Sequence, residues 1–136
     1  MFPQNTKILV VDDMPTIRDL VKSQLRALGM KNVLEAGDGQ AGFTVIENAM
    51  ALGLPVELVI CDWNMPKLTG LELLKQLRAS DEFASLPFIL LTSESERDQV
   101  TEAILAGVSQ YIVKPFAAKA FEDKLKAVWN KLGKAS

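Results

Sequence analysis

The stretch Ile8-Leu9-Val10-Val11-Asp12-Asp13 decides the fold class. Four apolar residues stand in a row, without the alternation of a strand that has one face in water, and two acidic residues follow them directly. Such a continuous run is typical of a strand buried on both faces of a parallel sheet. We therefore expect helices to cover both faces of that sheet.

Four more apolar runs, at residues 33–34, 58–61, 88–91 and 111–113, read as further strands. The segments between and after the runs carry apolar residues at helical spacing: Ile17, Leu20, Val21, Leu25 and Leu28; Phe43, Ile46 and Met50; Leu71, Leu74 and Leu77; Val100 and Ile104; Phe121, Leu125, Val128 and Leu132. This alternation predicts an α/β fold, a doubly wound five-stranded parallel sheet with five helices and right-handed crossovers. We expect a single domain over residues 1–136, with no appended output domain.

Composition narrows the classes of partner and chemistry. With 15 basic and 17 acidic residues the chain has a net charge of -2, which does not favour binding to nucleic acid or to an anionic membrane surface. The N-terminus lacks the features of a secretory signal and no apolar run approaches the ~20 residues of a membrane span, so we expect a cytoplasmic protein. Cys61, the only cysteine, stands in an apolar run and is expected in the core. Because the chain has no histidine, its chemistry must use carboxylates, hydroxyls and lysine.

Polar residues follow four of the five apolar runs. Asp12-Asp13 follow the first, Asp62 the third, Thr92-Ser93 the fourth and Lys114-Pro115 the fifth. In a doubly wound sheet, ligands bind beyond the carboxyl ends of the strands. The sequence therefore predicts that three carboxylates, a hydroxyl and an ammonium group meet at one edge.

Each of these residues also has a purely structural interpretation. Asp13 is a good N-cap for a helix that begins with a proline in its first turn. Asp62 suits a turn, and Thr92-Ser93 suits the cap of the next helix. Lys114 could be an ordinary solvated lysine. All four interpretations would have to hold together, which makes the shared site the better hypothesis.

The predicted acidic group favours a divalent cation. Three carboxylates at one edge repel one another, which raises their pKa values unless a cation intervenes. All candidate ligands are hard oxygen donors, which suit Mg²⁺ better than zinc. Mg²⁺ commonly bridges carboxylates to a phosphoryl group, and a carboxylate can itself accept that group as an aspartyl phosphate. The residues thus indicate phosphoryl chemistry.

With these residues in place, the chain resembles the receiver domain of bacterial two-component response regulators over residues 5–133. Asp12-Asp13, Asp62, Thr92 and Lys114-Pro115-Phe116 all match that family's pattern. Within the family the chain is most similar to the stand-alone chemotaxis regulators, through residues 62–66 (Asp-Trp-Asn-Met-Pro), residues 92–94 (Thr-Ser-Glu) and Tyr111. The resemblance implies a flavodoxin-like sheet with the strand order 2-1-3-4-5.

The resemblance also implies roles for individual residues. Asp62 would accept phosphate from a histidine kinase. Asp13, Asp62 and the backbone carbonyl of Asn64 would bind Mg²⁺, and Asp12 would contribute through water. Lys114 would contact the phosphoryl oxygens, with the Pro115 bond expected to be cis and to shape the loop. Thr92 and Tyr111 would be the switch residues, which change position on phosphorylation. Asn64 and Glu94 would tune the lifetime of the phosphorylated state.

The resemblance implies that phosphorylation changes a surface made by the fourth helix, fifth strand and fifth helix. A flagellar motor switch protein would bind this surface, and a phosphatase is a possible further partner. Residues 94–98 (Glu-Ser-Glu-Arg-Asp) depart from the basic character of chemotaxis regulators there, so a non-flagellar protein target stays open. Acidic residues in a first helical turn also simply complement the helix dipole. The rival class is an enzyme, a Mg²⁺-dependent phosphatase or phosphotransferase with an aspartate nucleophile, but Asp12-Asp13-Met14-Pro15 lacks the spaced Asp-x-Asp pattern of the haloacid-dehalogenase type. We expect a phospho-acceptor and not an enzyme.

Overall fold

A computed structural model describes residues 1–93 and 99–132. Strands and helices alternate along the chain, as the apolar pattern predicts. The strands are β1 (Ile8–Val11), β2 (Val33–Ala36), β3 (Leu58–Asp62), β4 (Phe88–Thr92) and β5 (Gln110–Val113). The helices are α1 (Pro15–Ala27), α2 (Gly39–Ala51), α3 (Gly70–Arg78), α4 (Val100–Leu105) and α5 (Ala118–Lys131).

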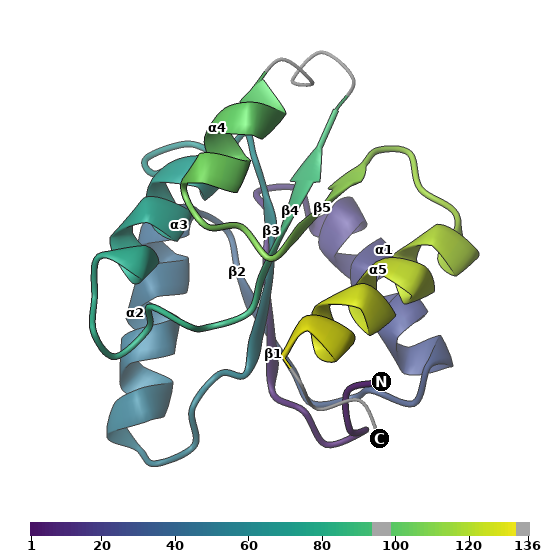
Figure 1. The fold of residues 1–136 in the computed structure, drawn as a ribbon. Helices are drawn as coiled ribbons and strands as arrows, with labels where there is room; N and C mark the ends of the chain where they lie inside the picture. Colours follow the sequence, from purple (N-terminus) through teal and green to yellow (C-terminus); the bar gives the residue numbers. More distant parts are fainter. Residues whose placement is uncertain (94–98, 133–136) are drawn as a thin grey trace.

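The five strands form one parallel sheet in the order β2-β1-β3-β4-β5. Helices α1 and α5 cover one face of the sheet, and α2, α3 and α4 cover the other (Figure 1). The chain reverses its direction of progress across the sheet at β1, which lies between β2 and β3. The predicted fold class and strand order are both confirmed.

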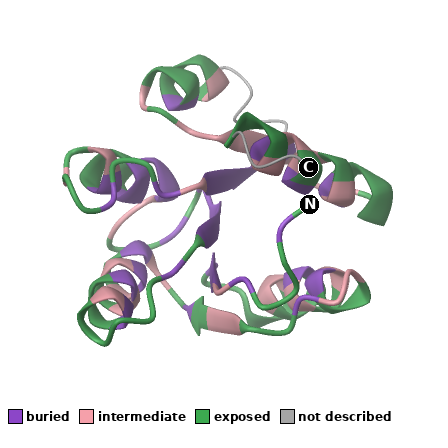
Figure 2. Ribbon diagram, turned by 60° about the horizontal axis from the view of Figure 1, so that its bottom comes forward, coloured by how far each residue is buried: buried purple, intermediate pink, exposed green. Residues whose placement is uncertain are grey.

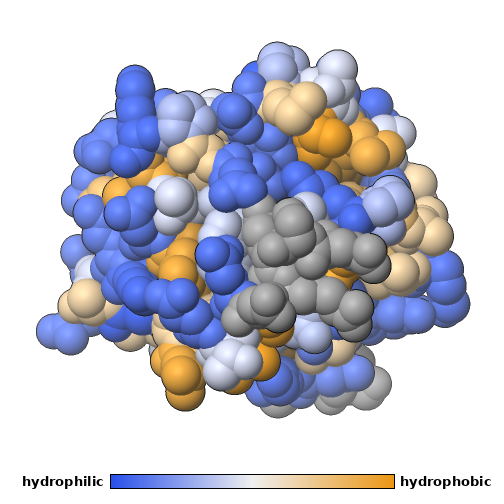
Figure 3. All heavy atoms as spheres, turned by 90° about the horizontal axis from the view of Figure 1, so that it is seen from above, coloured by the Kyte–Doolittle hydropathy of each residue, from blue (hydrophilic) through white to orange (hydrophobic). Residues whose placement is uncertain are grey.

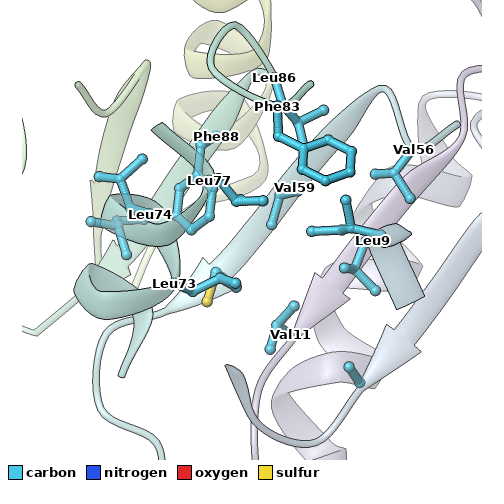
Figure 4. Close-up of a cluster of buried hydrophobic side chains, with 14 of the residues drawn as sticks. Leu9, Val11, Val56, Val59, Leu73, Leu74, Leu77, Phe83, Leu86 and Phe88 are labelled. Atoms are coloured by element: carbon cyan, nitrogen blue, oxygen red, sulfur yellow. The ribbon is translucent and has the colours of Figure 1, made fainter. Parts of the chain in front are cut away.

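Two apolar cores fill the spaces between the sheet and its helical layers. Every residue of β1, β3 and β4 is buried, which explains why these strands read as continuous apolar runs. Figure 2 shows the buried positions concentrated in the sheet and on the inward faces of the helices. Figure 4 shows part of the core on the α2–α3 face, where Leu9 lies near Val56, and Val59 lies near Leu77 and Phe88.

Local signals in the sequence account for where helices begin and end. Asp38 caps α2 by accepting a hydrogen bond from Ala41 N at 2.8 Å. Thr69 and Glu72 form a reciprocal capping box at the start of α3. After α1 the chain turns at Gly29, whose φ of 85° is a left-handed conformation that favours glycine.

Three apolar residues expected on buried helical faces are exposed, so those predictions are wrong. Leu132 is 38% exposed at the C-cap of α5. Leu20 of α1 is 45% exposed, because Val21 and Leu25 face the core and a neighbouring position is rotated by about 100°. Ile104 of α4 is 58% exposed, because the small side chain of Ala103 is the one that faces the core.

Cys61 and Trp129 both pack in the apolar cores. Cys61 is fully buried, as expected of a small core residue. Trp129 packs against Phe2, with ring centroids 5.0 Å apart. In the described part of the chain, no helix is both long enough and apolar enough to cross a membrane.

Candidate functional site

Four strands deliver polar residues to their carboxyl ends, at the edge of the sheet that Figure 3 views from above. Asp12 and Asp13 follow β1, Asp62 is the last residue of β3, Thr92 is the last residue of β4, and Lys114 follows β5. Since the strands are parallel, residues separated by up to a hundred positions in the sequence come together at one edge.

The three carboxylates form one compact group. Asp12, Asp13 and Asp62 each offer an oxygen, and these oxygens all lie within 4.8 Å of one another. Asp12 and Asp62 are buried, whereas Asp13 is exposed. Among residues 1–93 and 99–132 this is the one group of at least three such ligands with metal-binding spacing.

Burial makes this group costly to ionise when no cation is bound. The pKa of Asp12 is raised from 3.8 to about 6, chiefly by burial and further by the charge of Asp62, against the hydrogen bond from Met14 N. The pKa of Asp62 is also raised, again chiefly by burial, although the hydrogen bond from Lys114 opposes the shift. The site therefore favours a bound positive charge.

The geometry fits a hard divalent cation. All three side-chain ligands are carboxylates, the oxygen donors that Mg²⁺ prefers. Asp12 Oδ2 is buried and has no hydrogen-bond partner within the described residues, so it is an acceptor without a donor. Asn64, whose carbonyl is the fourth implied ligand, lies two residues after Asp62 on the connection to α3.

Lys114 supplies the positive charge that the structure itself places at the site. Its Nζ lies 2.6 Å from Asp62 Oδ1 and forms an ion pair with it. The peptide bond between Lys114 and Pro115 is cis, as the resemblance implies. The backbone N–H of Lys114 donates to the carbonyl of Thr92 at 2.6 Å, which ties the residue to the end of β4.

Thr92 ends β4, the strand next to the acceptor strand β3, and Tyr111 lies on β5, on the far side of β4. Thr92 is fully buried, and its Oγ1 has no hydrogen-bond partner within the described residues. Tyr111, on β5, is half-buried, and Lys124 Nζ lies 4.9 Å from the centre of its ring. Glu94, the other residue expected to tune the phosphate's lifetime, lies outside the described residues.

The structure removes two of the purely structural interpretations. The N-cap of α1 is Met14, and no side chain caps that helix, so Asp13 is not its cap. A cap by Thr92-Ser93 would involve the segment 94–98, which lies outside the described residues. Lys114 is paired with a buried carboxylate and is not a solvated surface lysine.

Sequence reasoning missed Gly70, which shapes the acceptor loop. Its N–H donates to the carbonyl of Trp63 at 2.9 Å, and a Cβ there would overlap the carbonyl oxygen of Asp62. The position after the Thr69 cap gives no sign of this, because the contact depends on how α3 packs against β3.

Comparisons with known proteins agree with this geometry. The family described as "Response regulator receiver domain" matches residues 8–126. Chemotaxis protein CheY-3 of Vibrio cholerae is 42% identical over 129 residues, covering 95% of each chain. Chemotaxis protein CheY of Pseudomonas aeruginosa is 38% identical over 126 residues, covering 93% of this chain and 98% of that protein. The solved structure of CheY4 of Vibrio cholerae superposes with a TM-score of 0.79 at 30% identity, covering 91% of this chain and 98% of that one.

Proposed function

This chain belongs to the response-regulator receiver family, and on that premise we propose that it is a phosphorylation switch whose acceptor is Asp62. CheY-like receiver domains are signalling proteins that take phosphate from histidine kinases and act on downstream targets. The observation that carries the assignment of the acceptor is the position of Asp62, within 4.8 Å of the acidic pair and 2.6 Å from Lys114.

Phosphoryl transfer to Asp62 follows from the chemistry of a carboxylate nucleophile. A carboxylate oxygen attacks the phosphorus of a phosphohistidine, the P–N bond breaks as the P–O bond forms, and the leaving imidazole takes up a proton. Bound Mg²⁺, held by Asp13, Asp62, the Asn64 carbonyl and, through water, Asp12, would neutralise charge on the phosphoryl oxygens. The ammonium group of Lys114 is placed to exchange its contact with Asp62 for one with the new phosphoryl group.

The proposed switch passes through Thr92 and Tyr111. Thr92 Oγ1 is buried and has no hydrogen-bond partner in the part of the chain that the structure describes, which supports a move that gives this hydroxyl a phosphoryl oxygen as its partner. Tyr111 is half-buried on the neighbouring strand, and its further burial would change the surface formed by α4, β5 and α5. Driving such an equilibrium from mostly off to mostly on requires roughly 5 kcal/mol, which a few charge-assisted hydrogen bonds can supply.

We propose a role in chemotaxis, with a flagellar motor switch protein as the target. The support is the near full-length similarity to proteins named as chemotaxis regulators. The acidic residues 94–98, which weakened this expectation, lie outside the described residues. Titrating a motor switch protein with the phosphorylated and unphosphorylated chain tests the target, and equal affinity of the two forms would contradict it.

The acceptor is tested with a small phosphodonor such as acetyl phosphate and Mg²⁺. We expect a shifted band on a phosphate-affinity gel and a change in fluorescence of the buried Trp63, which follows Asp62 directly. Both signals should vanish in Asp62→Ala and in EDTA, and both should persist in Asp81→Ala, which alters an exposed aspartate. Persistence of the gel shift in Asp62→Ala would place the acceptor elsewhere.

A further inference from the structure

A network of side-chain hydrogen bonds connects α1 and β2 to the turn at Asp12, which follows β1. Arg18 of α1 donates through Nε to Glu35 Oε1 at 3.0 Å and through Nη1 to the backbone carbonyl of Asp12 at 2.6 Å. Lys22, one turn further along α1, donates to the other Glu35 oxygen at 2.8 Å. The network joins α1, the edge strand β2 and the turn between β1 and α1.

The backbone of Asp12 is fixed at both of its polar atoms. Its N–H donates to the carbonyl of Ala36 on β2 at 3.1 Å, and its carbonyl accepts from Arg18. Its side chain accepts from Met14 N through Oδ1 at 2.9 Å, which leaves Oδ2 as the oxygen without a partner among the described residues. Of these three hydrogen-bond partners of Asp12, only Arg18 makes its contact with a side chain; Ala36 and Met14 use backbone atoms.

Glu35 orients the guanidinium group of Arg18. The carboxylate shares its two oxygens between two cations, and the hydrogen bonds from Lys22 and Arg18 hold its pKa below the ordinary value. A planar guanidinium with one edge held by a carboxylate presents its remaining N–H groups in a fixed direction. In this structure that direction meets the carbonyl of Asp12.

Stability alone is a weak explanation for this network. Its side chains are partly exposed, at 20%, 27% and 35% for Arg18, Lys22 and Glu35, and ion pairs of that kind contribute little to folding. Fixing the backbone of Asp12 matters more for cation binding, because Asp12 would contact the cation through water, and losing an outer-shell residue of a metal site typically lowers metal affinity by about 10–100-fold.

We propose that Arg18 is a positioning residue for the divalent-cation site, and that Glu35 sets its orientation. Arg18 acts through the backbone of Asp12 and does not contact the cation. The inference rests on the proposed function, since it assigns a role in the same Mg²⁺ site. It extends that site to two residues that no motif at the strand ends includes.

The test is a Mg²⁺ titration followed by Trp63 fluorescence, beside urea unfolding in EDTA. The variants are Arg18→Ala, Arg18→Lys and Glu35→Gln. Lys22→Ala is the matched control, because it removes an ion pair to the same carboxylate and leaves the bond between Arg18 and Asp12 in place.

We expect Arg18→Ala to weaken Mg²⁺ binding about tenfold or more, with Arg18→Lys and Glu35→Gln in between and Lys22→Ala within about twofold of wild type. The urea midpoints in EDTA should fall by similar small amounts for Arg18→Ala and Lys22→Ala, since both remove partly exposed ion pairs. A network with a merely structural role would lower the same midpoints but leave the Mg²⁺ affinities of Arg18→Ala and Lys22→Ala alike, and that result would overturn the proposal.

The two proposals fail in distinguishable ways. If wild type binds Mg²⁺, and Asp62→Ala abolishes that binding, but Arg18→Ala binds as tightly as wild type, the positioning role is overturned alone. If wild type shows no Mg²⁺ binding at all, both the cation site and the role of Arg18 are overturned.

Discussion

Replacing Asp12 by asparagine in the metal-free protein isolates the cost of ionising a buried carboxyl beside two others. Asn has nearly the same shape, and its Oδ1 can still accept the hydrogen bond that Met14 N donates at 2.9 Å. Asn differs from Asp in having no ionisable group. Asp12 is 1% exposed, and its pKa is about 6 in the folded protein against 3.8 for the ordinary group.

The sign and size of the effect follow from these two pKa values. A carboxyl whose pKa is raised on folding contributes its full stability below pH 3.8, and that contribution declines as pH rises toward the folded value of about 6. At about 1.4 kcal/mol for each unit of pKa difference, ionisation costs the folded state about 3 kcal/mol above pH 7. About half of that loss, roughly 1.4 kcal/mol, falls between pH 5 and pH 8.

The assay is urea unfolding in EDTA at pH 5 and pH 8 for wild type, Asp12→Asn and the exposed-site control Asp81→Asn. We expect the free energy of unfolding of Asp12→Asn, relative to wild type, to rise by roughly 1.4 kcal/mol from pH 5 to pH 8. The new amide nitrogen costs about 1–3 kcal/mol if it stays unpartnered, but this cost is the same at both pH values and cancels from the comparison.

A relative stability of Asp12→Asn that is equal at pH 5 and pH 8 would refute the reasoning. Asp62 is retained in both proteins, and it enters the comparison only through the repulsion that raises the pKa of Asp12. A high Mg²⁺ concentration should stabilise wild type more than Asp12→Asn at pH 8. A ligand that binds only the folded state adds RT ln(1 + [L]/Kd), and we expect Asp12→Asn to have the larger Kd.

Three further predictions concern the loop and the switch around the acceptor. Gly70→Ala should lower the free energy of unfolding by about 1–3 kcal/mol, because its Cβ would overlap the carbonyl of Asp62, whereas Gly37→Ala, with its nearest atom 4.0 Å away, should be near neutral; equal urea midpoints would contradict this. Thr69→Ala should cost about 1 kcal/mol by removing the capping box of α3, measurable by the same unfolding assay, and a loss near zero would show that the cap is dispensable. Lys114→Ala should still take phosphate from acetyl phosphate on a phosphate-affinity gel but show little change in partner affinity, and a wild-type change in affinity would exclude Lys114 from the switch.

The sequence determined the alternation of strands and helices and the residues that end the strands. Continuous apolar runs such as Ile8–Val11 are a local signal of burial on two faces, and the structure places those strands as expected. Once the sheet is parallel, the convergence of Asp12, Asp62 and Lys114 follows, because every carboxyl end lies at the same edge. The order of the strands came from the resemblance to a family and not from the runs themselves.

Tertiary structure alone decided how the elements meet. Spacing in one helix does not fix its rotation to within one residue, so Leu20 and Ile104 were placed on the wrong side of their helices. The contact of Arg18 with Glu35 and Asp12, like the 2.6 Å pair of Lys114 with Asp62, joins elements whose separation depends on strand order and crossover packing. The sequence pattern does not predict such contacts, because each depends on how two segments are placed relative to one another and not on the spacing of residues within either segment.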